Sequence, residues 1–209
     1  MPNITGPALA FPSKAFPGTQ AGAPTGIGGE VLLSELVGKY ATLVKMQKVF
    51  YTSAIITAPV IFSTAAQLGP QIWNRPASGV DAHILGIGVG SPTTATTVAG
   101  AIGYASNVQP TAPTTPTAIT AVNAYAGGGP SAMGAVNSTA TVIILPVPIF
   151  MPLIGVNTGA VTTGAISMSW ADVGGLFIVG PGNVGYVCSS ATLSSGVFTI
   201  GLVWAELPT

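Results

Sequence analysis

The sequence predicts an all-β protein: a β-sandwich or jelly-roll-like domain over residues 30–209, preceded by an extended arm over residues 1–29. Short apolar runs of strand length recur along the chain, separated by turns rich in glycine and proline. Strand-like and helix-like stretches do not alternate, as they would in a protein with a parallel sheet. Charged residues make up only 5% of the chain and hydrophobic residues 48%, whereas disordered chains are polar and highly charged.

The first 29 residues are incompatible with a helix or a central strand. Prolines recur about every five residues, at Pro2, Pro7, Pro12, Pro17 and Pro24. The segment nonetheless carries spaced apolar side chains, at Ile4, Leu9, Phe11 and Phe16. We interpret it as an attachment arm in which these four residues bind a neighbouring subunit, with a disordered tail as the alternative.

Residues 30–51 have the composition most compatible with a helix. Leucines at positions 32, 36 and 43 favour a helix, but Gly38 interrupts the stretch, and the β-branched Val44 and Val49 favour strands. We interpret the stretch as one or two strands, and a short helix is the alternative.

Further strands are predicted at residues 55–63, broken by Pro59, and at residues 83–89. In the second of these, alternation places Ile84, Gly86 and Gly88 on one face, and Leu85, Ile87 and Val89 on the other. Residues 91–139 are rich in Thr, Ala, Pro and Gly and are interpreted as long connections. The remaining predicted strands are 140–145, 166–170, 175–179, 185–189 and 197–204.

The chain carries only five basic and five acidic residues, and this small number argues against some classes of partner. Nucleic-acid binding is not expected, because neutralising phosphates requires clustered lysines and arginines. The nearest approach to such a cluster, Lys39, Lys45 and Lys48, is interpreted as a solvated edge or an inter-subunit contact. Because so few charges do little to keep a monomer soluble, we expect an oligomer, with a homotrimer as the first expectation.

No membrane-spanning segment and no secretory signal are expected. The longest uncharged apolar run, residues 141–156, contains Pro146, Pro148 and Pro152, whereas a spanning helix needs about 20 apolar residues with intact hydrogen bonds. The N-terminus has no basic start followed by an apolar core.

Groups capable of chemistry are few, so we expect no enzymatic activity, no cofactor and no metal. Residues 180–185 match the G-x-G-x-x-G string of dinucleotide sites, but strand-like residues follow where a helix is required, so we interpret them as a turn. Asp81 and His83 would point the same way on a strand and are interpreted as structural. Cys188 is interpreted as a small buried hydrophobic residue. The tryptophans are interpreted as core or interface residues: Trp73, Trp170 and Trp204.

Four short motifs carry a resemblance: GEVLLSELVGKY at residues 29–40, PQIWNRP at 70–76, GPGNVGY at 180–186 and VWAELP at 203–208. In style and order the chain resembles virion proteins of tailed bacteriophages that act as capsid decoration (cement), head-fibre or tail-associated components with β-sandwich subunits. The resemblance implies a structural protein located in the virion, bound to the major capsid protein or another virion protein. A tail-fibre or receptor-binding module for host adhesion is the alternative.

Overall fold

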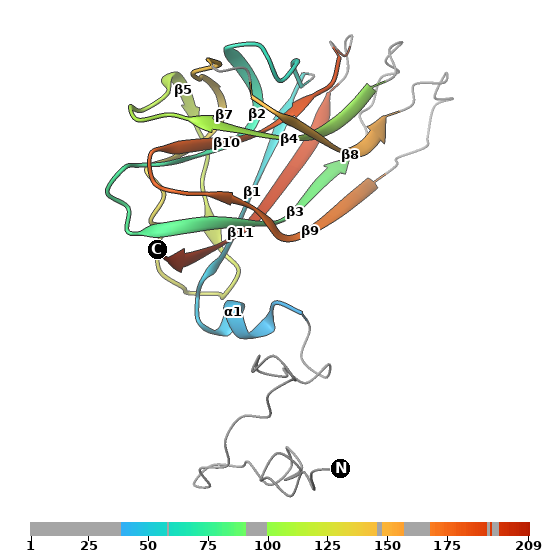
Figure 1. Cartoon of the computed structure of the whole chain (residues 1–209). Helices are drawn as coiled ribbons and strands as arrows, with labels where there is room; N and C mark the ends of the chain where they lie inside the picture. The colour runs from blue at the N-terminus through green and yellow to red at the C-terminus, as the bar shows by residue number, and fades with distance from the viewer. Residues whose placement is uncertain are drawn as a thin grey trace, which may run out of the picture. The chain divides into compact units, whose positions relative to one another are not determined.

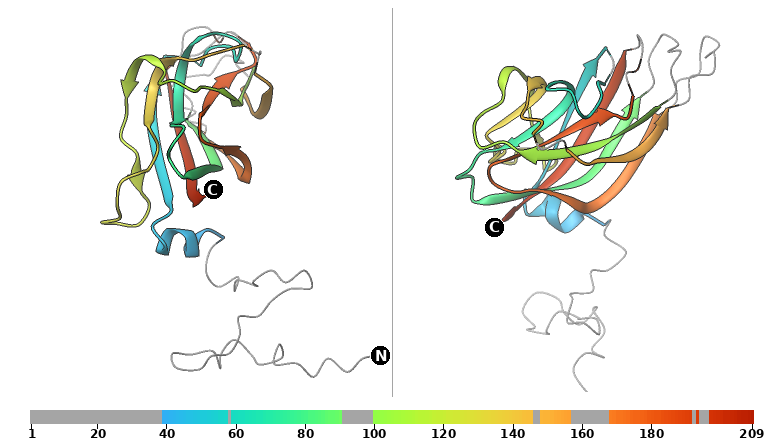
Figure 2. Two further views of the ribbon diagram at one scale, coloured as in Figure 1. Left: turned by 60° about the vertical axis from the view of Figure 1, so that its left-hand side comes forward. Right: turned by 45° about the horizontal axis from the view of Figure 1, so that its top comes forward.

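The structure is a computed structural model that describes residues 39–57, 59–90, 100–145, 148–156, 168–191, 193 and 197–209. The predicted arm, residues 1–29, lies outside the described residues. All the strands belong to one compact unit, Leu43–Thr209. They form two antiparallel sheets that face each other, so the predicted all-β sandwich is confirmed (Figures 1 and 2).

The five-stranded sheet has the order β6 (Val122–Asn123), β1 (Val49–Ile56), β11 (Phe198–Pro208), β3 (Val80–Gly90) and β9 (Met168–Val179). The six-stranded sheet has the order β5 (Thr114–Ala118), β7 (Ala135–Thr141), β2 (Ala66–Asn74), β10 (Asn183–Ser189), β4 (Gly100–Val108) and β8 (Phe150–Val156).

The strand order is that of a jelly roll. Strands β1 to β4 alternate between the two sheets, β4 pairs with β8 inside the six-stranded sheet, and β9 to β11 alternate back. The antiparallel pairs β1–β11, β2–β10, β3–β9 and β4–β8 make one long two-stranded ribbon that folds over into two sheets. Strands β5 to β7 are inserted between β4 and β8 and extend the two sheets beyond β1 and β2.

The main core lies between the sheets. Strand β11 supplies every second residue to it, Phe198, Ile200, Leu202 and Trp204, which is the period expected of a strand with one buried face. Two stacked aromatic pairs pack in the core. The ring centres of Phe50 and Trp204 are 5.9 Å apart, and those of Tyr104 and Phe177 are 4.9 Å apart. The predicted strands 185–189 and 197–204 are confirmed.

A β-bulge in β3 overturns the predicted alternation of that strand. Ile84 pairs with Trp204 and Gly86 with Val203, so that Leu85 has no partner of its own on β11. The extra residue returns Ile84 to the same face as Ile87, and both are fully buried in the core. The prediction that placed Ile84 opposite Ile87 was therefore wrong, whereas Gly86 and Gly88 do lie on the face away from the core.

The short helix α1 (Ala41–Lys45) replaces the strand predicted across these positions. The strand interpretation was wrong there, and the short-helix alternative is confirmed. The helix ends because Gln47 has a positive φ of 58°, which lets the Lys48 N–H donate to the Leu43 carbonyl at 2.9 Å. Strand β1 then begins at Val49.

Other predicted strand boundaries change as well. The predicted strand 55–63 ends at Ile56, and the predicted strand 140–145 overlaps β7 only at residues 140–141. The described part of the predicted strand 166–170, residues 168–170, lies in the same strand, β9, as residues 175–179. The predicted connection 91–139 contains strands β4 to β7. Strand β2 was missed because its buried side chains include amides. Asn74, for example, donates to the carbonyls of Val80 at 2.7 Å and Val179 at 2.8 Å.

Where β4 meets β8, the closeness of the two backbones requires a glycine. A Cβ added at Gly103 would lie 2.0 Å from the carbonyl oxygen of Met151, which is backbone and cannot rotate away. We expect Gly103→Ala to lower the free energy of unfolding by about 1–3 kcal/mol, as overpacking does. The matched control is Gly155→Ala on β8, where a Cβ meets nothing within 4 Å. Urea denaturation checks both variants, and equal midpoints would contradict the close approach.

Candidate interaction surface

The two sheets differ in what lies on their outer faces. On the six-stranded sheet, Val184, Tyr186 and Cys188 of β10 point away from the main core into a second apolar cluster. The chain covers this cluster itself: Phe62, Val142, Ile144 and Phe150 pack on it, and the rings of Phe62 and Phe150 are 5.4 Å apart. The Tyr186 hydroxyl donates to the Phe62 carbonyl at 3.1 Å, which holds this cover in place.

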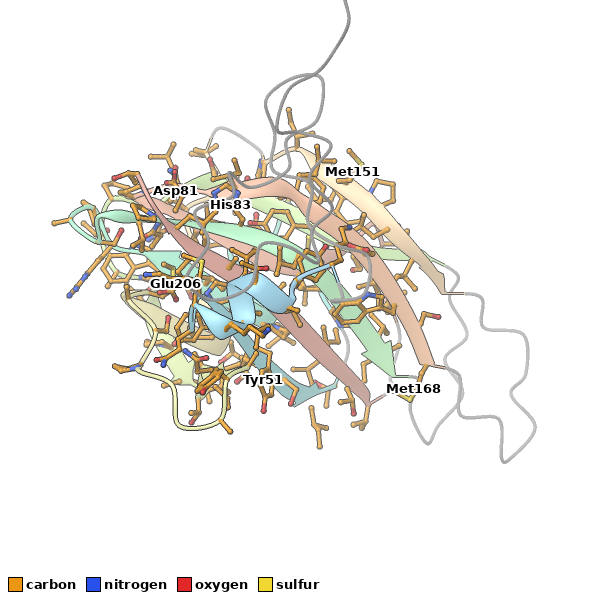
Figure 3. The ribbon with its side chains drawn as sticks, turned by 90° about the horizontal axis from the view of Figure 1, so that it is seen from below. Tyr51, Asp81, His83, Met151, Met168 and Glu206 are labelled. Atoms are coloured by element: carbon orange, nitrogen blue, oxygen red, sulfur yellow. The ribbon has the colours of Figure 1, made fainter. Side chains whose placement is uncertain are left out.

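The outer face of the five-stranded sheet instead leaves large apolar side chains exposed. We define this outer face by the exposed residues Tyr51, Ile55, Met168, Trp170, Leu176 and Ile178. Ile55, Leu176 and Met168 are 74%, 72% and 83% exposed. Figure 3 is drawn from this side, with Tyr51 and Met168 labelled. Several such side chains on one sheet face are typical of a surface that a partner covers.

The indole of Trp170 lies on two glycines of β3. A Cβ added at Gly86 would lie 2.2 Å from Cζ2 of Trp170, and one at Gly88 would lie 3.2 Å from its Cε3. The glycines therefore let the ring lie down on the sheet, where a larger side chain would push it away. Trp170 as a whole residue is nevertheless 57% exposed, so it is accessible to a partner.

A groove crosses the sheet beside this indole. Direct cross-strand pairs join Ser53 to Gly201, Gly201 to Gly88, and Gly88 to Trp170, so small residues form the floor between β1 and β9. The groove has a volume of about 460 Å³ and is lined by Ser53, Gly88, Val89, Gly90, Met168, Ser169, Trp170, Thr199 and Gly201. No charged residue is among them. This volume lies in the range of ligand pockets, about 300–1,000 Å³.

Of the glycines that line this groove, only Gly88 could be placed from the sequence, and the groove itself could not be predicted. The alternation of Gly86 and Gly88 with apolar residues is visible in the sequence and places them on one face. Their proximity to Trp170 depends on the pairing of β3 with β9, which are far apart in sequence.

A second hollow, of about 250 Å³, lies around the buried carboxylate of Glu206, with Lys48 among its lining residues. Glu206 accepts hydrogen bonds from the Ser131 hydroxyl, from the Ala132 N–H at 2.8 Å and from Nε1 of Trp204 at 3.1 Å. The carboxylate thereby holds the segment that precedes β7, at Ser131 and Ala132, against strand β11. Sequence reasoning gave this residue no role, because nothing nearby in the sequence shows that it is buried.

Asp81 and His83 lie at the start of β3 with His83 on the outer side of the sheet (Figure 3). His83 is next to Gly175, whose added Cβ would lie 3.8 Å from the His83 Cβ. Across the described residues, no three His, Cys, Asp or Glu side chains are grouped so that they could hold a metal ion.

The predicted turn at residues 180–185 is formed by residues 180–183. The Asn183 N–H donates to the Gly180 carbonyl at 3.2 Å, Pro181 occupies the second position, and Gly182 has a φ of 78°. This is the pattern of a type II turn. Strand β10 begins directly at Asn183, so no helix starts here to hold a pyrophosphate.

The three tryptophans differ in burial. Trp204 is fully buried in the main core, Trp73 packs on the second cluster and donates to the Gln109 carbonyl at 2.8 Å, and Trp170 is exposed. The Lys39 ammonium lies 5.0 Å from the ring centre of Tyr40, and Lys45 is exposed. The four predicted arm residues, Ile4, Leu9, Phe11 and Phe16, lie outside the described residues.

Cys188 is fully buried in the second cluster, which confirms its interpretation as a small hydrophobic residue. Burial raises the pKa of its thiol, and burial followed by the proximity of Cys188 raises the pKa of the Tyr186 hydroxyl. The folded protein therefore keeps protons that the unfolded chain releases above about pH 8.5 for cysteine and about pH 10 for tyrosine.

The free energy of unfolding should consequently be highest below this pH range and fall as the pH rises through it. The decline is about 1.4 kcal/mol per pH unit for each group that stays protonated in the folded protein and is deprotonated in the unfolded chain. We expect Cys188→Ala to remove the part of this decline that begins near pH 8.5. Urea denaturation at pH values from 7 to 10 measures it. An unchanged slope in the variant would show that the thiol is not the source.

Comparison with protein-family models, curated proteins and solved structures finds no match for this chain. Within the part of the chain that the structure describes, no helix has the length and apolar character needed to cross a membrane.

Proposed function

We propose that this chain is a structural protein of a tailed-bacteriophage virion, where it decorates or stabilises the capsid as a cement or head-fibre component. It works as a homotrimer bound to the major capsid protein or another virion protein, and it carries out no catalysis. The observation that carries the proposal is the exposed apolar outer face of the five-stranded sheet on a chain with only ten charged residues in 209.

In an assembled particle, contacts with neighbouring subunits cover such a surface, so its apolar side chains are no longer exposed to water. Exposed side chains such as Ile55 and Leu176 favour association, and charges that would oppose it by repulsion are scarce. Contacts of this kind depend little on salt, because screening weakens charge interactions and leaves apolar burial intact. A shell component that is exposed to variable ionic strength benefits from apolar association and from the weak dependence of this association on salt.

The jelly roll supports the proposal by analogy, since this architecture is used by viral capsid proteins as well as lectins. The sequence motifs at residues 29–40, 70–76, 180–186 and 203–208 add the resemblance to tailed-phage virion proteins. In this proposal the arm, residues 1–29, attaches the domain to a neighbouring subunit through Ile4, Leu9, Phe11 and Phe16.

The test is to locate the chain on purified phage particles with gold-labelled antibody in the electron microscope. Regularly spaced label on the head is the expected result. Label confined to the tail tip would favour the alternative, a tail-fibre or receptor-binding module. Particles that carry no label, and that lack the chain by mass spectrometry, would overturn the virion assignment.

A further inference from the structure

The groove beside Trp170 is an apolar site on an exposed face. Its floor includes the glycines 88, 90 and 201, and it is lined on the β9 side by Trp170 and Met168. Three lining residues carry hydroxyl groups, Ser53, Ser169 and Thr199, and none of the lining residues is charged. Such a groove suits an apolar segment with few charges that brings its own aromatic side chain.

We propose that this groove receives residues 10–17 of a neighbouring copy of the chain, so that arms are exchanged between subunits. The inference rests on the proposed oligomeric assembly and names the contact that the arm makes in it.

The segment has the chemistry that the groove requires. Residues 10–17 contain the same tripeptide twice, Ala10-Phe11-Pro12 and Ala15-Phe16-Pro17, and Lys14 is the one charged residue in the first 29. Proline-rich segments bind grooves lined by aromatic residues because their backbone is restricted before binding and little conformational freedom is lost. The Phe-Pro unit that lies at Trp170 offers a flat ring and a proline to the indole and the glycine floor.

The repeat also has the right spacing. From β1 to β9 the groove crosses three strand spacings, about 14 Å in total. Five residues of polyproline II backbone extend about 15 Å. One phenylalanine at Trp170 would therefore bring the other near Ile55 on β1. Because polyproline II has three residues per turn, the second ring is rotated by about a third of a turn and meets projecting side chains rather than the floor.

The connecting chain is long enough to reach another subunit. Residues 18–38 separate the repeat from the first described residue, and a segment of that length extends up to about 70 Å. The same length would also let the arm reach its own groove, so the experiment has to separate the two cases.

The test joins arm and groove by a disulfide between two full-length chains. All chains carry Cys188→Ala, and a tagged donor with Phe16→Cys is co-expressed with an acceptor carrying Thr199→Cys in the groove. The matched control acceptor carries Thr117→Cys, which is exposed on β5 of the other sheet. After mild oxidation we expect a donor–acceptor dimer with Thr199→Cys on a non-reducing gel, and its loss with Thr117→Cys or when Trp170→Ala is added to the acceptor.

Equal dimer yields for the two acceptors would overturn the proposal. So would a chain carrying both Phe16→Cys and Thr199→Cys that forms only an internal disulfide, because the arm would then occupy its own groove. Light scattering of the unaltered protein separates this failure from that of the proposed function. An oligomer without the specific cross-link overturns the arm exchange alone, whereas a monomer overturns the oligomeric assembly as well.

Discussion

Replacing Ile55 and Leu176 together by serine is expected to convert the oligomer into a folded monomer at micromolar concentration. Both side chains belong to the outer face and are 74% and 72% exposed in the single chain. Burying each of them in an interface contributes about 1.5–3 kcal/mol, and every subunit of an oligomer loses both contributions. Size-exclusion chromatography with light scattering measures the mass, and circular dichroism checks that the strands are retained.

The matched control replaces Leu145 and Ile149 by serine. These residues are 76% and 90% exposed, so they are as apolar and as accessible, but they lie in the connection between β7 and β8 rather than on the outer face. We expect this pair to leave the mass unchanged. If the control pair dissociates the oligomer and the outer-face pair does not, the interface lies elsewhere on the domain.

The second large effect is expected from Glu206→Ala, which should lower the free energy of unfolding by about 3 kcal/mol or more. The change leaves the Ser131 hydroxyl, the Ala132 N–H and Nε1 of Trp204 without their common acceptor. Hydrogen bonds to a charged group contribute about 1.5–3 kcal/mol each, and an unsatisfied buried donor costs about 1–3 kcal/mol.

Guanidinium denaturation at a fixed protein concentration measures this change, because oligomer stability depends on concentration. Glu206→Gln keeps one acceptor oxygen and should cost less than Glu206→Ala. Thr114→Ala, at an exposed position on β5, serves as the control with little expected effect. A Glu206→Ala variant as stable as this control would show that the carboxylate does not hold the connection before β7.

Much of the fold could be predicted because it depends on local patterns. Alternating apolar residues predict β11, and the Gly-Pro-Gly-Asn sequence predicts the turn before β10. What failed depends on distant partners. The buried amides of β2 look like loop residues until carbonyls from other segments reach them, and the bulge at Leu85 exists only in the pairing of β3 with its two neighbours, β11 and β9.

The sequence by itself determined that this protein is an all-β chain with few charges, a proline-rich start and glycines on one side of β3, because composition and period-two alternation are properties of neighbouring residues. Only the tertiary structure decided which apolar residues become core and which become surface. The chain covers the outer face of one sheet with Phe62 and Ile144, and leaves Ile55 and Trp170 exposed on the other. Burial depends on which distant segments pack together, and no local pattern distinguishes an apolar residue covered by its own chain from one that remains exposed.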